Sequence, residues 1–272
     1  MSWVVISPVS EQGCMSPEDF EEWDSAAYKA LNIHADFAEQ YLEVERRLKE
    51  DANPDEIIDC LSHTSANVLG MGHGNETAIS ANNCQIWLHT GNIPNWVRGR
   101  VFVMVSCLTG AELGPAVMKK GAAAYFGLQN VGILVGAPNP GYCRFFYASF
   151  IGLIQAAISI ELGHDAGTAA RKAVARWNNE IDYWLEFYEQ EKIVFSDGTE
   201  IPVDVGFAQA LAVCLVHNRD SFVAYPVVEV SELRRAEQIV MALIATGAIA
   251  GLAYLGSRWE GRLPAPAHKP SL

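Results

Sequence analysis

Four short apolar runs constrain the fold of this chain more than any other feature of its sequence. They read WVVIS at residues 3–7, NVLGM at 67–71, VFVMV at 101–105 and AAAYF at 122–126. Each has the length of a strand, and the third is made almost entirely of β-branched and aromatic residues, which favour strands. Because the apolar residues are consecutive and do not alternate with polar ones, both faces of these strands must be buried.

Segments of helical character separate these runs, and this alternation predicts a mainly parallel sheet between two layers of helices. The expected fold class is therefore α/β, as a three-layer α/β/α sandwich. Helices are expected from Pro54 onward and over residues 17–50 (broken near Asn32), 113–120, 143–162 and 166–188. Residues 75–100 are expected to be mostly loop with one short strand at 85–88, and a hairpin is expected around Asp197 and Gly198.

The overall charge and the cysteines exclude several functional classes. The net charge of −13 argues against a nucleic-acid partner, because such partners select basic surfaces. None of the six cysteines lies in a CxxC pair, so nothing indicates a zinc or thioredoxin-type site. The first apolar run is too short for a signal-peptide core. We therefore expect a reducing cytoplasm, with one cysteine available as a nucleophile and the others buried as small hydrophobic residues.

Residues 239–256 form an uncharged stretch with arginines on both sides. As a helix this stretch would be about 27 Å long, close to the hydrocarbon thickness of about 30 Å. It predicts a single-pass C-terminal membrane anchor with the preceding domain in the cytoplasm; the alternative is a core helix of a soluble cytoplasmic protein. Gly247 and Gly251 form a GxxxG step that permits two such helices to pair in a homo-oligomer.

The chain accordingly divides into a folded domain at residues 1–232, a membrane helix at 233–257 and a short polar, Pro-rich tail at 258–272. The helix expected over 143–162 is apolar as well, but four polar residues interrupt it. We expect that helix to be buried within the folded domain.

Two strand ends carry the residues with the clearest chemical potential, His73 and Cys107. His73 lies between two glycines after one apolar run, and Cys107 follows the run at 101–105 after one serine. In a parallel sheet the functional crevice lies beyond the carboxyl ends of the strands, so neighbouring strands would bring these two side chains together. A thiolate nucleophile with an imidazole partner is the requirement of thiol catalysis. The backbone N–H groups of Gly74 and Cys107 are then candidates for an oxyanion hole.

Simpler interpretations exist for each residue alone. A lone strand-end cysteine is most often a core residue, and a histidine flanked by glycines is most often a turn residue. The glycine pattern at residues 70–74 also imitates a dinucleotide-binding loop, but that reading requires a helix directly afterwards. Residues 75–83 have no helical period, which argues against it.

Taken together, the motifs resemble the caspase-like cysteine peptidase clan, which includes caspases, gingipains, separase and bacterial CHAT-domain peptidases, and most of all its gingipain and CHAT branch. The matching elements are Gly-His-Gly at 72–74, Ser-Cys-Leu-Thr-Gly at 106–110, and a helix followed by AAAYFG at 122–127. The resemblance covers roughly residues 1–225. Many members carry alanine where this chain has Ser106, and serine is small enough for the same place.

The resemblance implies a cysteine endopeptidase in which His73 is the general base and acid and Cys107 the nucleophile. It implies a polypeptide substrate, and no cofactor or metal is expected. Glu11, Glu76 and Glu112 are the candidate substrate-binding residues, and an acidic pocket built from any of them would favour cleavage after Arg or Lys. The alternative is a catalytically weak caspase-like scaffold that acts through membrane-linked oligomerisation.

Overall fold

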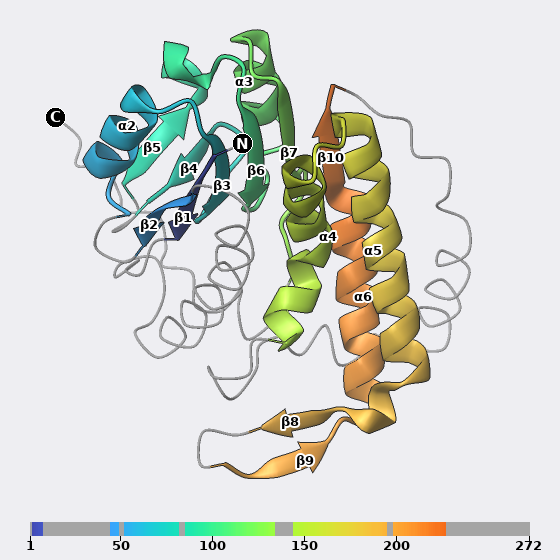
Figure 1. The fold of residues 1–272 in the computed structure, drawn as a ribbon. Coiled ribbons are helices and arrows are strands. Elements are labelled where there is room, and N and C mark those ends of the chain that lie inside the picture. The colour runs from blue at the N-terminus through green and yellow to red at the C-terminus, as the bar shows by residue number, and fades with distance from the viewer. Residues whose placement is uncertain are drawn as a thin grey trace, which may run out of the picture.

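A six-stranded sheet forms the centre of the molecule (Figure 1), which is a computed structural model that describes residues 2–7, 44–48, 52–81, 85–133, 144–194 and 198–226. Its strands are β1 (Trp3–Ser7), β2 (Val44–Leu48), β3 (Asn67–Met71), β6 (Val101–Val105), β7 (Ala124–Leu128) and β10 (Phe222–Tyr225). Their order is β2-β1-β3-β6-β7-β10, and only β10 runs antiparallel to its neighbour. The predicted mainly parallel sheet is therefore present.

Helices follow the strands largely where the sequence predicts them. They are α2 (Pro54–His63), α3 (Leu113–Lys119), α4 (Arg144–Glu161), α5 (Ala166–Glu186) and α6 (Val205–Ser221), with short 3₁₀ turns η3 (Thr90–Asn92), η4 (Asn95–Val97) and η5 (Tyr188–Gln190). Two hairpins complete the described residues: β4 (Ala78–Ser80) with β5 (Ile86–His89), and β8 (Lys192–Val194) with β9 (Glu200–Pro202). The second is the hairpin predicted around Gly198.

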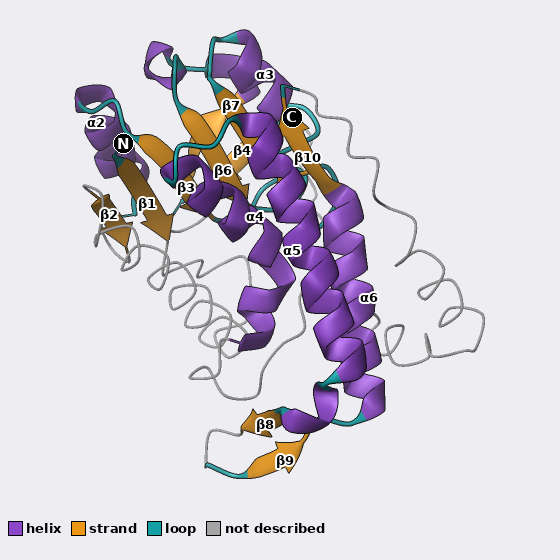
Figure 2. Ribbon diagram, turned by 45° about the vertical axis from the view of Figure 1, so that its right-hand side comes forward, coloured by secondary structure: helices purple, strands orange, loops and turns teal. Residues whose placement is uncertain are grey.

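The two faces of the sheet are covered by different elements, as Figures 1 and 2 show. Helices α4, α5 and α6 pack on one face, against side chains such as Trp3 and Val103. Helix α2, the β4–β5 hairpin and α3 pack on the other, against Val4 and Phe102. Successive residues of one strand thus enter opposite cores, and this explains why the apolar runs are continuous. The arrangement is compatible with the predicted three-layer sandwich.

Helix α4 is apolar because it is buried in the domain. Its Gly152 lies so close to the ring of Trp177 on α5 that an added Cβ would be 2.1 Å from a ring carbon. The indole of Trp177 donates a hydrogen bond to the carbonyl of Ser149 on α4 (3.3 Å). Within the described residues no helix has both the length and the apolar character to cross a membrane, and the predicted anchor at 239–256 lies outside them.

Two predictions in the N-terminal half are wrong. Residues 44–48 were expected to be helical, yet they form β2, which pairs in parallel with β1. Their glutamate and arginines favour helices in isolation, but the pairing with an open sheet edge overrides that preference. Residues 75–100 contain β4 as well as β5, because β4 is only three residues long and gains its stability from its partner. The other residues of the helix expected at 17–50 lie outside the described ranges.

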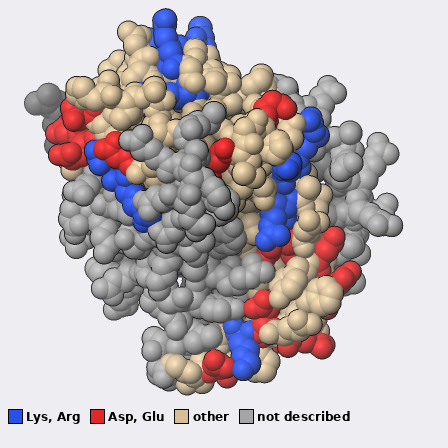
Figure 3. Space-filling view, viewed as in Figure 1, with Lys and Arg blue, Asp and Glu red and all other residues tan. Residues whose placement is uncertain are grey.

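Charged side chains of the described residues are distributed in separate groups over the surface in the view of Figure 3, with Lys and Arg beside Asp and Glu. One pair joins the two strands of the β8–β9 hairpin, where the Lys192 ammonium lies 2.7 Å from the Glu200 carboxylate. Both side chains are exposed, so this pair contributes little to stability.

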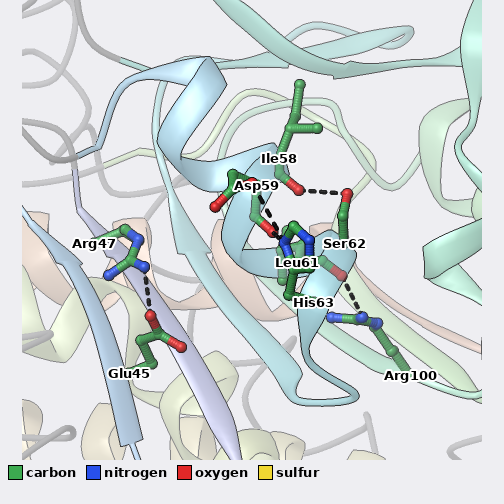
Figure 4. Close-up of polar contacts among 8 residues, drawn as sticks. All are labelled: Glu45, Arg47, Ile58, Asp59, Leu61, Ser62, His63 and Arg100. Carbon is green, nitrogen blue, oxygen red and sulfur yellow. Dashed lines mark hydrogen bonds and ion pairs between the residues drawn. The ribbon is translucent and has the colours of Figure 1, made fainter.

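A buried arginine connects the end of α2 and the segment before β3 to the start of β6, and Figure 4 shows its contact with Leu61. The guanidinium of Arg100, just before β6, donates hydrogen bonds to the carbonyls of Leu61 (2.6 Å), Ala66 (3.0 Å) and Thr64. These carbonyls belong to the end of α2 and the segment that leads into β3. Arg100 also lies over the ring of Trp96, 5.5 Å from its centroid. The side chain thereby fixes the end of α2 against the start of β6.

Replacement of this arginine tests its anchoring role. We expect Arg100→Met to lower the free energy of unfolding by about 3 kcal/mol, because it leaves three carbonyls without their charged donor. Urea unfolding of the full chain, followed by tryptophan fluorescence, measures the effect. Arg98→Met, at an exposed position two residues earlier, is the matched control. Equal unfolding midpoints for the two variants would contradict the anchoring role.

Candidate active site

The two predicted catalytic residues follow neighbouring strands at the same edge of the sheet. Strands β3 and β6 are parallel and directly paired, with Met71 opposite Val105. His73 comes two residues after Met71, and Cys107 comes two residues after Val105. The predicted adjacency of the two strands is confirmed, and their register places both residues equally far beyond the last pair. Both lie at the carboxyl ends of parallel strands, where α/β proteins bind ligands.

The two glycines around His73 are required by close packing. A Cβ on Gly72 would lie 2.4 Å from the carbonyl oxygen of Ser80. A Cβ on Gly74 would lie 2.3 Å from the hydroxyl of Ser106 and 2.7 Å from the carbonyl oxygen of Cys107. Real Cβ atoms do not approach other atoms so closely, so only glycine fits at either position. The backbone of the histidine loop therefore lies directly against the cysteine loop.

The β4–β5 hairpin holds the backbone of His73. The carbonyl of His73 accepts hydrogen bonds from the backbone N–H (2.9 Å) and the hydroxyl (3.1 Å) of Ser80. Gly74 pairs with Ile79 in an isolated antiparallel bridge. The hydrogen bonds of this bridge are made by the residues next to Gly74 and Ile79, not by these two residues themselves. The N–H of Gly74 therefore points away from the hairpin. A strand and not a helix follows the glycines, so the dinucleotide-loop alternative is wrong.

A backbone hydrogen bond also joins the residues that follow His73 to the residues that follow Cys107. The N–H of Leu113, at the start of α3, donates to the carbonyl of Glu76 (2.8 Å). The backbones of Glu76 and Glu112 therefore meet at one rim, and both side chains are exposed. The third candidate for an acidic pocket, Glu11, lies outside the described residues. A role of these carboxylates in substrate binding remains a prediction.

Cys107 lies on a tight turn beneath the segment that follows β7. Its half-buried sulfur accepts a hydrogen bond from the N–H of Gly132 (3.2 Å). The next residue, Leu108, has a φ of 62°, a left-handed conformation that a branched side chain rarely adopts. Its N–H donates to the carbonyl of Asn130 (3.0 Å). Such strain persists only where the surroundings impose it, and it is frequent at functional sites.

The last turns of α6 hold residues 130–133 in place; these residues cover Cys107 and are called the covering segment below. The side-chain amide of the fully buried Asn218 accepts from the N–H of Ile133 (2.8 Å) and donates to its carbonyl (2.6 Å). A ring nitrogen of His217 lies 2.8 Å from the carbonyl of Val131. Asn218 thus positions Gly132, which contacts the thiol. The sequence offers no signal for this role, because Asn218 and Ile133 are 85 residues apart.

Burial favours the neutral form of both candidate catalytic groups. Burial lowers the pKa of His73, so the imidazole is uncharged at pH 7. Burial raises the pKa of Cys107, and the N–H of Gly132 opposes this effect in part. Both shifts favour a neutral imidazole and a neutral thiol over an imidazolium and a thiolate.

Cys107 differs from the other two cysteines that the structure describes. Cys60 and Cys214 are buried and free, and burial raises the pKa of the Cys60 thiol to about 11 and that of Cys214 to about 12. Both fit the prediction that the remaining cysteines are small core residues. Three more cysteines lie outside the described residues: Cys14, Cys84 and Cys143.

Comparison of the chain with protein-family models, with curated proteins and with solved structures finds no match. Its function has to be inferred from the site itself.

The neutral state of Cys107 predicts a pH dependence of its alkylation. Only the thiolate reacts with iodoacetamide, so the rate rises through the thiol pKa. Because burial raises that pKa, we expect a midpoint above the value of about 8.5 for a free cysteine. Mass spectrometry of the digested full chain gives the rate for the Cys107 peptide, and the Cys60 and Cys214 peptides serve as internal controls. A midpoint well below 8.5 would instead indicate a preformed thiolate–imidazolium pair.

Proposed function

We propose that this chain is a cysteine endopeptidase of the caspase-like type, with Cys107 as the nucleophile and His73 as the general base and acid. The observation that carries the proposal is the contact between the two loops. Gly74 leaves no room for a side chain against Cys107, and the two residues extend neighbouring parallel strands. The site therefore combines a thiol and an imidazole at the edge of the sheet where ligands bind.

The neutral pair fits a general-base mechanism. His73 takes the proton of the Cys107 thiol as the sulfur attacks the carbonyl carbon of the scissile peptide bond. His73 then returns that proton to the amine nitrogen as the C–N bond breaks, and a thioester remains on Cys107. In the second half, water attacks the thioester with His73 again as base, the acid leaves, and the thiol is regenerated.

The oxyanion of each tetrahedral intermediate needs donors that are already in place. The backbone N–H groups of Gly74 and Cys107 are the proposed pair. In support, the N–H of Gly74 points away from the hairpin, and the missing Cβ permits close approach of a substrate carbonyl. Donors fixed in this way stabilise developing charge without reorganisation.

The proposal extends to specificity and location. Glu76 and Glu112 would form an acidic rim that selects Arg or Lys at P1, the residue on the acyl side of the cleaved bond. Residues 239–256 would anchor the domain to a membrane from its cytoplasmic side and pair through Gly247 and Gly251. The support for the anchor is the uncharged length of that stretch, which matches a bilayer core.

A second candidate is a caspase-like scaffold with weak turnover. The observation in its favour is the covered thiol, whose pKa is raised by burial and whose sulfur is engaged by Gly132. Removal of residues 233–272 separates the two functions: a peptidase keeps its cleavage, whereas a scaffold that acts through membrane-linked oligomers loses its effect.

Proteolysis is tested most simply by loss of the thiol. We expect the full chain, incubated with a mixture of proteins, to generate new N-termini that Cys107→Ala does not, because the sulfur forms the covalent intermediate. Mass spectrometry of labelled N-termini detects them, and fluorogenic peptides that vary only at P1 should be cleaved fastest after Arg or Lys.

Cys214→Ala is the matched control, since it removes a thiol that is buried in the core. It should leave the new termini unchanged. Identical termini from the wild-type chain and Cys107→Ala would exclude the peptidase assignment, and a preference for Asp at P1 would exclude the acidic pocket alone.

A further inference from the structure

A hollow of about 230 Å³ opens beside His73, on the side of the β4–β5 hairpin. We refer to it as the His73 hollow. Its lining residues come from the histidine loop and the hairpin: His73, Gly74, Asn75, Ala78, Ser80 and Ile86. Its volume is sufficient for one aliphatic side chain. The hollow is thus a second feature of the same sheet edge, next to the imidazole.

The position of the hollow relates it to one half of a substrate. His73 contributes to its wall, whereas Cys107 does not belong to the described residues that line it. In thiol catalysis the sulfur bonds to the acyl carbon, and the imidazole gives its proton to the leaving nitrogen. The chain that follows this nitrogen therefore continues on the imidazole side. In the proposed peptidase, the hollow would therefore lie on the side of the leaving group.

The walls of the hollow combine the apolar Ala78 and Ile86 with the polar His73, Asn75 and Ser80, and two of these polar side chains already have protein partners. The side-chain oxygen of Asn75 already accepts the N–H groups of Thr77 and Ala78, both at 2.9 Å. The hydroxyl of Ser80 donates to the carbonyl of His73 at 3.1 Å. Ile86 leaves 54% of its surface exposed, so its side chain presents apolar surface to an occupant of the hollow.

The lack of charged side chains among the described lining residues also favours an uncharged occupant. Among the described residues that line the hollow, only His73 is titratable, and burial lowers the pKa of that imidazole. None of these described residues carries a carboxylate or ammonium that would balance a charged ligand, so an ionic side chain would lose hydration without gaining a partner from them. A neutral aliphatic side chain would instead cover Ile86 and gain from burial of apolar surface.

We propose that the His73 hollow is the subsite for P1′, the residue directly after the cleaved bond, and that it selects an aliphatic side chain of the size of valine or leucine. This inference rests on the proposed peptidase function. It assigns Ile86 as a specificity-determining residue and the β4–β5 hairpin as the platform for the leaving half of the substrate.

Two substitutions at Ile86 test the assignment in the full chain. Internally quenched peptides with one fixed acyl half vary only at P1′, as Gly, Leu, Lys or Glu. We expect the wild type to prefer Leu over Gly, and Ile86→Ala to lower kcat/KM for the Leu peptide about ten-fold while the Gly peptide changes little. Ile86→Glu should shift the preference towards Lys at P1′, because it adds a carboxylate to the wall.

Ile201→Glu on the distant β8–β9 hairpin is the matched control, since Ile201 is similarly exposed (42%). It should leave the P1′ profile unchanged. An unchanged profile in both Ile86 variants, or a change in P1 preference in place of P1′, would overturn the subsite. Absence of cleavage by the wild-type chain on every peptide, at the level of Cys107→Ala, would instead reject the peptidase function itself.

Discussion

The structure of the site depends on one steric constraint, the contact of Gly74 with the loop that carries Cys107. An added Cβ would meet the Ser106 hydroxyl and the Cys107 carbonyl at under 3 Å, so the two loops touch through backbone. Gly72 imposes the same condition against Ser80 on the other side. The backbone of the histidine loop is thereby held between the hairpin and the cysteine loop. In the proposed peptidase, these restraints would supply the preorganisation that a catalytic pair requires.

The covering segment gives the thiol a second set of restraints. Asn218 binds both backbone groups of Ile133, and the adjacent Gly132 donates to the Cys107 sulfur. Helix α6, which lies late in the chain, thus positions the backbone that contacts the Cys107 sulfur. Burial raises the pKa of the Cys107 thiol, although the N–H of Gly132 opposes this effect. Under the proposed function, the imidazole would therefore act as a base during attack.

Sequence reasoning predicted the features that depend on local pattern. The continuous apolar runs predicted a sheet buried on both faces, and the residues after β3 and β6 predicted which edge of the sheet carries the candidate site. It was wrong at residues 44–48, because pairing with β1 outweighs the helix preference of Glu45 and Arg46. It missed Asn218, whose hydrogen bonds to Ile133 join segments that are 85 residues apart. Such contacts have no periodicity or spacing that a single sequence records.

The central claim is that His73 and Cys107 act as one unit, and a double-mutant cycle on the full chain measures this directly. The kcat/KM for a cleaved peptide is compared for His73→Ala, Cys107→Ala and the double variant. When residues act together, the effects of their substitutions on the free energy of activation are not additive. We therefore predict that each single variant falls to the same low level, at least about 10³-fold below wild type, and that the double variant falls no further. Near-normal activity of His73→Ala, or losses that multiply in the double variant, would contradict the account.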